Sequence, residues 1–132
     1  MTEFDGVFFK EIVEHGLREF PNECCGVIAG RDGTPVKVYP MKNADASPVT
    51  YRLDGREQLQ VFDAIDDEGL DLWAIYHSHT HSEAYPSDTD IRLAFYPDAR
   101  YLLLSLADRD DPVLRSFSIL DGEVTEEELR IT

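Results

Sequence analysis

The sequence is organised around Leu72-Trp73-Ala74-Ile75-Tyr76-His77-Ser78-His79, an apolar run that ends in histidines. A continuous apolar run of this length is typical of a β-strand that is buried on both faces of a sheet. Residues 77–86 are polar and predict a loop, so the histidines are expected where the buried strand reaches solvent. Because side chains two apart on a strand point the same way, His77 and His79 can offer two imidazole nitrogens to one ion.

Outward from this strand, helices and strands alternate. Apolar residues at three- and four-residue steps predict a helix over residues 8–20, with Asp5 as its cap and Pro21 as its end. Asp54 and Glu57 have the spacing of a capping box, which predicts a second helix that ends near Gly69. The remaining pattern predicts a brief helix over 87–95, strands over 24–29, 36–39, 101–107 and 114–120, and a hairpin turn at 121–122 into a final strand from 124.

The length of 132 residues and the unbroken pattern predict a single domain over residues 1–132, with a mixed α/β layered fold. Lys and Arg number 12 against 27 Asp and Glu, which gives a formal charge of −15. Such a surface repels phosphate backbones and anionic lipids, so we expect no nucleic acid and no membrane as a partner. No apolar run approaches the roughly 20 residues that span a bilayer.

The cysteines and the N-terminus predict a cytoplasmic location. Cys24 and Cys25 are adjacent, and neighbouring Cα atoms about 3.8 Å apart are too close for a relaxed disulfide. The acidic start of the chain lacks the basic-then-apolar order of a signal peptide. Both features predict a reducing compartment.

A third ligand is expected from the brief helix. Ser87 and Asp90 are three residues apart at its start and share one face. If that helix end faces the strand end, Asp90 joins His77 and His79 in a set of two histidines and one carboxylate, which is a catalytic zinc arrangement with a fourth position open to water. A simpler reading stays open, in which Ser87 and Asp90 only cap the helix and the histidines only fill space. His81 is interpreted as a solvated or supporting group rather than a ligand.

The spacing His77-x-His79, seven residues, Ser87, two residues, Asp90 resembles the signature of the JAMM (MPN+) metalloproteases at every defined position. That family carries a catalytic glutamate upstream, and Pro21-Asn22-Glu23-Cys24-Cys25-Gly26 is similar to the segment that holds it. The resemblance implies a curved mixed sheet flanked by helices, as in cytidine deaminases. It also implies one Zn²⁺ per chain on His77, His79 and Asp90, with Glu23 and Ser87 as catalytic residues.

The resemblance extends along nearly the whole chain to a bacterial branch that acts on sulfur-carrier proteins. Eukaryotic deubiquitinating members usually have Pro where this chain has Thr80, and they carry long insertions for which it has no room. The implied function is a zinc-dependent peptidase that releases cysteine from the C-terminus of a ubiquitin-like sulfur carrier of the CysO, MoaD or ThiS kind, in cysteine biosynthesis.

Three alternatives remain open at this point: removal of a ubiquitin-like modifier from protein lysines, a non-catalytic scaffold, and metal storage or regulation. The assembly state also stays open, with a homodimer among the alternatives.

Overall fold

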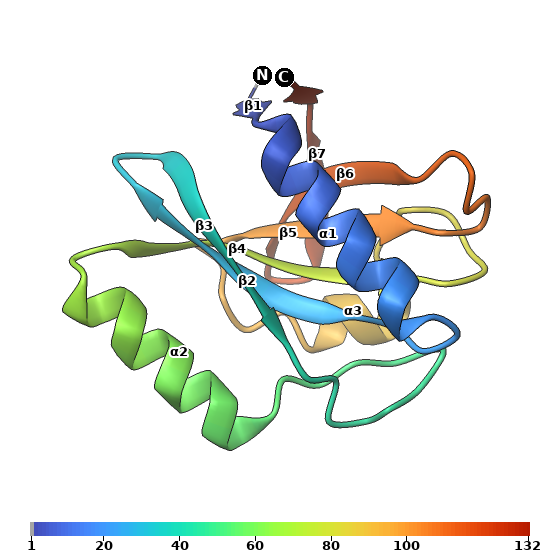
Figure 1. The fold of residues 1–132 in the computed structure, drawn as a ribbon, viewed down its shortest axis with the longest axis horizontal. Coiled ribbons are helices and arrows are strands. Elements are labelled where there is room, and N and C mark those ends of the chain that lie inside the picture. Colours follow the sequence, from blue (N-terminus) through green and yellow to red (C-terminus); the bar gives the residue numbers. More distant parts are fainter. Residues whose placement is uncertain (1) are drawn as a thin grey trace.

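A six-stranded mixed β-sheet forms the centre of the computed structural model, which describes residues 2–132 (Figure 1). The strand order is β3-β2-β4-β5-β6-β7, and β4 and β5 are its parallel pair, while the other neighbours are antiparallel. The six strands are β2 (Cys25–Arg31), β3 (Thr34–Met41), β4 (Asp71–His79), β5 (Arg100–Ser105), β6 (Val113–Leu120) and β7 (Glu123–Glu127). A short parallel pair, β1 (Thr2–Phe4) and β8 (Leu129–Ile131), joins the two ends of the chain.

The two long helices, α1 (Gly6–Glu19) and α2 (Gly55–Asp67), contribute to separate cores on the two faces of the sheet. Strand side chains alternate between these cores, so Leu102 packs in the core of α1 and its neighbour Leu103 in the core of α2. The mixed α/β layered fold is confirmed. Among residues 2–132, no helix is both long enough and apolar enough to cross a membrane.

The first helix follows the prediction closely, and the second departs from it at its start. Asp5 caps α1 by accepting a hydrogen bond from the Val7 N–H at 2.9 Å. Asp54 caps α2 by accepting from the Glu57 N–H at 3.2 Å. The reciprocal half of the capping box is wrong, because the Glu57 carboxylate instead accepts from the Lys42 N–H at 2.7 Å. Glu57 therefore ties the residue after β3 to α2.

Several predicted boundaries are wrong for local reasons. The β2–β3 hairpin turns at Asp32 and Gly33, which have φ of 53° and 82°, so the strands are longer and the turn tighter than predicted. The third helix, α3 (Asp88–Arg92), is shorter than the predicted 87–95. β1 and β8 were not predicted, because three residues are too few to display a periodic pattern.

Strand β4 continues through His79, three residues into the segment predicted as a loop. Its parallel neighbour β5 pairs His77 with Leu103 and His79 with Ser105. Parallel strands need a crossover connection, and here that connection contains α3. The crossover leaves the carboxyl end of β4, which is where open α/β sheets bind ligands.

Candidate metal centre and catalytic site

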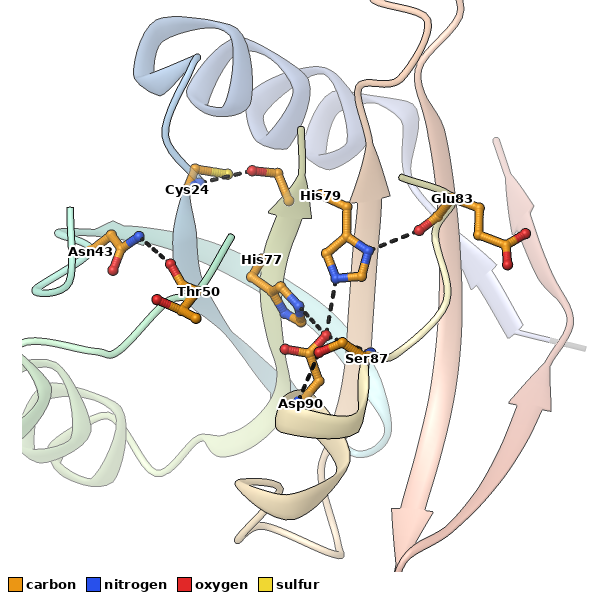
Figure 2. A network of polar contacts seen from close by, with 9 residues as sticks. Cys24, Asn43, Thr50, His77, His79, Glu83, Ser87 and Asp90 are labelled. Atoms are coloured by element: carbon orange, nitrogen blue, oxygen red, sulfur yellow. Dashed lines mark hydrogen bonds and ion pairs between the residues drawn. The ribbon is translucent and has the colours of Figure 1, made fainter. Parts of the chain in front are cut away.

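The carboxyl end of β4 brings two histidines and one aspartate together (Figure 2). His77 and His79 are 1% and 6% exposed. Their Nε2 atoms lie 3.1 and 3.0 Å from the same oxygen, Oδ2 of Asp90 in α3. The ligand atoms of these three side chains all lie within 4.8 Å of one another. The structure thus assembles the three residues that the spacing predicted as metal ligands.

The start of α3 fixes the Asp90 carboxylate. Oδ2 of Asp90 accepts a hydrogen bond from the Ser87 N–H at 2.9 Å, and Oγ of Ser87 accepts from the Asp90 N–H at 3.0 Å. This reciprocal pair is a capping box, so the simpler reading of Ser87 and Asp90 as a helix cap holds geometrically. It does not compete with a ligand role, because the capped oxygen is the one that faces the imidazoles.

The donor set fits a zinc ion. Nδ1 of His79 lies 2.8 Å from the Glu83 carbonyl oxygen, which only accepts, so Nδ1 carries a proton, and whenever the ring is neutral it presents a lone pair at Nε2. A lone pair and a carboxylate oxygen 3.0 Å apart repel one another unless a positive charge accompanies them. Tetrahedral nitrogen and oxygen ligands at about 2.0–2.2 Å from zinc lie roughly 3.3 Å apart, close to the two observed separations.

The charges of the cluster also suit a cation. Burial raises the pKa of Asp90, but hydrogen bonds from His77, His79 and the Ser87 N–H outweigh burial, and the pKa falls well below its ordinary value. Burial lowers the pKa of His77 more than Asp90 raises it. Burial also lowers the pKa of His79, but hydrogen bonds to Asp90 and the Glu83 carbonyl outweigh it and raise that pKa. Asp90 is therefore held as a carboxylate, and His77 as a neutral ring, which are the forms that bind metals.

Glu23 lies two residues before Cys25, the first residue of β2, which pairs with His77 of β4. Glu23 is near enough to His79 and Asp90 for the charges of both to act on the pKa of its carboxyl group. Its side chain is 4% exposed, and its Oε1 has no hydrogen-bond partner within residues 2–132. Burial raises the pKa of Glu23 to about 8, while the charge of His79 lowers it and that of Asp90 raises it by smaller amounts. A buried carboxyl group with a free oxygen and a pKa near neutral is suited to accept a proton.

Two contacts at the site had no clear signal in the sequence. The ring of Tyr51 stacks on His77, with centroids 4.2 Å apart and planes 20° apart. Nδ1 of His77 has no hydrogen-bond partner within the described residues, so the ring is held by this stacking and by the contact of Nε2 with Asp90. The other contact is the carbonyl of Glu83, a backbone atom that no side-chain motif identifies.

His81, the last histidine of the stretch 77–81, lies beyond the end of β4 and is exposed. Its Nδ1 is 2.9 Å from Oγ1 of Thr80, and its ring centroid is 5.7 Å from that of Phe20, at the end of α1. The convergent group consists of His77, His79 and Asp90, without His81.

Together, the sheet and the buried cluster of two imidazoles and one carboxylate define the JAB class of domain. A family model described as prokaryotic homologues of the JAB domain matches residues 7–120, and the chain belongs to this family. The resemblance to JAMM/MPN proteins is confirmed.

Known relatives extend over most of the chain. It is 49% identical over 122 residues to the CysO-cysteine peptidase of Mycobacterium tuberculosis, covering 91% of this chain and 84% of that protein. It is 43% identical over 86 residues to a probable TtuB-protein conjugate cleaving protease of Thermus thermophilus, covering 64% and 57%. A solution structure of a Desulfitobacterium hafniense protein superposes with a TM-score of 0.89 at 38% identity, covering 100% and 93%.

Proposed function

We propose that this protein is a zinc-dependent peptidase that hydrolyses the amide at the C-terminus of a ubiquitin-like sulfur carrier and releases cysteine, in cytoplasmic cysteine biosynthesis. The observation that carries the proposal is the convergence of two imidazole Nε2 atoms on the Asp90 carboxylate, close to the buried carboxyl group of Glu23. The choice of substrate is supported by the 49% identity to a CysO-cysteine peptidase over 91% of this chain.

His77, His79 and Asp90 would hold the zinc ion. A zinc ion at such a site lowers the pKa of a bound water from ~15.7 toward ~7 and polarises a carbonyl oxygen. Glu23 takes a proton from the attacking water and gives it to the departing amine of cysteine. Its burial supports this role, because a base whose pKa lies near the working pH can both accept and return a proton.

Ser87 would stabilise the negative charge that develops on the carbonyl oxygen of the scissile amide. Its Oγ accepts the Asp90 N–H at 3.0 Å, which orients the hydroxyl and leaves its own proton free to donate. Removing one such donor costs about 3–4 kcal/mol of transition-state stabilisation in other hydrolases. The exposure of Ser87 leaves this hydroxyl accessible to a substrate.

Removal of a ubiquitin-like modifier from protein lysines is the second candidate function. It is favoured by the 43% identity to a probable TtuB-protein conjugate cleaving protease, although that match covers 64% of this chain. Both reactions break an amide after the C-terminal residue of the carrier, so the same five residues would serve either one.

Two adducts of the same carrier distinguish these functions. We expect the zinc-loaded protein to cleave a sulfur carrier extended by cysteine faster than the same carrier joined to the side-chain amine of a lysine peptide. Mass spectrometry of both reactions, with Glu23→Gln as the inactive control, measures the two rates. Faster cleavage of the lysine adduct would establish the second function in place of the first.

A cavity of about 330 Å³ lies next to the cluster and is our candidate for the groove that holds the carrier tail. Tyr51 lines it and also stacks on His77, so this one side chain connects the cavity wall with the cluster. Leu93 and Phe95, which are 48% and 70% exposed, contribute apolar surface to the same wall. The neighbouring residues Arg52 and Leu53 line it as well. Residues 82–86 do not line this cavity, and Ala84 among them is buried in the core of α2.

Placing a charge on this wall should weaken carrier binding without changing the chemistry. We expect Phe95→Asp to raise KM for the carrier adduct about 10-fold or more, with kcat within about twofold, because binding of the tail is lost equally from ground and transition states. Val7→Asp is the matched control, since Val7 is 68% exposed on α1 at the other face of the sheet. Equal KM values for the two variants would remove this cavity as the tail site.

A further inference from the structure

The side chain of Ser78 occupies a position in the β2–β4 hydrogen-bond ladder that a main-chain oxygen normally fills. In the antiparallel register that pairs Cys25 with His77, the next pair is Cys24 with Ser78. A hydrogen-bonded antiparallel pair exchanges two N–H···O=C bonds. The Ser78 N–H donates to the Cys24 carbonyl at 3.1 Å as expected, but the Cys24 N–H donates to Oγ of Ser78 at 2.8 Å. Figure 2 labels Cys24 and draws this hydrogen bond as a dashed line from it.

This exchange of acceptors marks the point where β2 and β4 separate. The Ser78 hydroxyl oxygen lies on a side chain, away from the row of main-chain carbonyl oxygens of β4. The backbone at Cys24, which bonds to it, therefore departs from regular β pairing. The preceding residue, Glu23, has already left the sheet, because its N–H donates to the Ser47 carbonyl at 2.9 Å. Its own carbonyl accepts from Nδ2 of Asn43 at 3.1 Å. The backbone of Glu23 is thus fixed between the loop 43–50 and the Ser78 hydroxyl.

Ser78 also lies between the two histidines of the cluster. Its side chain and Cys24 are both fully buried, so no solvent replaces the hydroxyl as an acceptor. A buried N–H that loses its acceptor costs about 1–3 kcal/mol, and the backbone at Cys24 would shift to recover a partner. Such a shift moves Glu23 relative to His77 and His79.

We propose that Ser78 is a positioning residue, whose hydroxyl sets the place of the Glu23 carboxylate relative to the two histidines through the Cys24 N–H. The proposal rests on the proposed function for the role of Glu23 as the base, and on the structure alone for the hydrogen bond. The hydroxyl touches neither substrate nor metal in this account. It acts through one main-chain contact.

The test compares Ser78→Thr with Ser78→Val, which have the same shape and differ in the hydroxyl. We expect Ser78→Val to lower kcat for the carrier adduct about 10- to 100-fold, because small displacements of a catalytic group have effects of this size. KM and zinc stoichiometry should stay within about twofold of wild type. Ser78→Thr should keep kcat within about threefold. Ser116→Ala, a fully buried serine bonded to Glu127, is the control for loss of a buried hydroxyl elsewhere and should leave kcat unchanged.

Two further measurements separate positioning from general damage. In the metal-stripped protein, amide hydrogen exchange at Cys24 should be about 10-fold faster in Ser78→Val than in Ser78→Thr. In the Glu23→Gln background, Ser78→Val should lower the remaining kcat less than about twofold, because the group that it positions is gone. Equal kcat values for the Ser78→Thr and Ser78→Val variants would overturn the proposal. So would a 10- to 100-fold loss of kcat from Ser78→Val in the Glu23→Gln background. Failure of wild type to cleave any carrier adduct would instead refute the proposed function, while the Cys24 exchange rates would still test the hydrogen bond.

Discussion

Glu23→Gln should lower kcat about 10²–10⁴-fold, which is the contribution of a positioned general acid–base group. Zinc stoichiometry should not change, because Glu23 is outside the convergent set of His77, His79 and Asp90. Steady-state rates on a cysteine-extended carrier and metal analysis of the same samples measure both quantities. Glu19→Gln, a change of the same kind at an exposed position on α1, is the matched control. An unchanged kcat in Glu23→Gln would favour the non-catalytic scaffold.

The same variant should be more stable than wild type when both are metal-free. Burial raises the pKa of Glu23 from 4.5 to about 8, so the folded protein holds a proton that the unfolded chain releases. The stability that Glu23 contributes is therefore present below pH 4.5 and is lost as the pH rises toward 8. We expect Glu23→Gln to exceed wild type in unfolding free energy by up to about 3 kcal/mol at pH 7, and by little at pH 4.5.

Urea unfolding of the metal-stripped proteins at the two pH values measures this difference. If Glu23 destabilises the fold but is needed for the reaction, Glu23→Gln lowers kcat and raises the free energy of unfolding. A Glu23→Gln protein that is less stable than wild type at pH 7 would show that Glu23 supports the fold instead.

Asp90→Asn should raise the zinc dissociation constant more than about 100-fold and abolish carrier cleavage. The substitution keeps an oxygen that can accept the Ser87 N–H, but it removes the charge that faces both imidazoles. Removal of a contact that supports a ligand lowers metal affinity about 10- to 100-fold at other sites, and loss of a ligand itself should lower it further. Competition with a chromophoric chelator measures the constant. Asp88→Asn, an acid in the same helical turn, should leave zinc affinity unchanged.

Metal binding should also stabilise the fold. At a zinc concentration 1,000 times the dissociation constant, binding to the native state adds about 4 kcal/mol, and this increment should disappear in Asp90→Asn. Ser87→Ala separates the cap from the ligand, because it should cost about 1 kcal/mol of stability and still bind zinc. If Asp90→Asn and Ser87→Ala had the same effect on zinc affinity, Asp90 would be a capping residue alone.

The sequence predicted the parts of this site that follow from local periodicity. His77 and His79 share a face because they are two apart on a strand, and Ser87 and Asp90 share a turn because they are three apart. The convergence of the two pairs depends on the crossover between β4 and β5, which no local pattern contains. That convergence was predicted only because the spacing of the motif resembles that of a known family.

Other features depend on tertiary contacts and had no such signal. Glu23 is one of 27 acidic residues, and the resemblance alone distinguished it. Tyr51 stacks on His77 because the loop after β3 returns to β4. Glu57 has a suitable spacing for a capping box, but its carboxylate instead accepts a hydrogen bond from the Lys42 N–H. Each outcome is decided by residues far apart along the chain.

The most direct test of the account is anomalous diffraction at the zinc edge from crystals of the zinc-loaded protein. We expect one peak per chain, about 2.0–2.2 Å from Nε2 of His77, Nε2 of His79 and a carboxylate oxygen of Asp90. The Glu23 carboxylate should face the remaining open side. A zinc peak that is absent from this cluster, or that lies at His15 or His81 instead, would contradict the account.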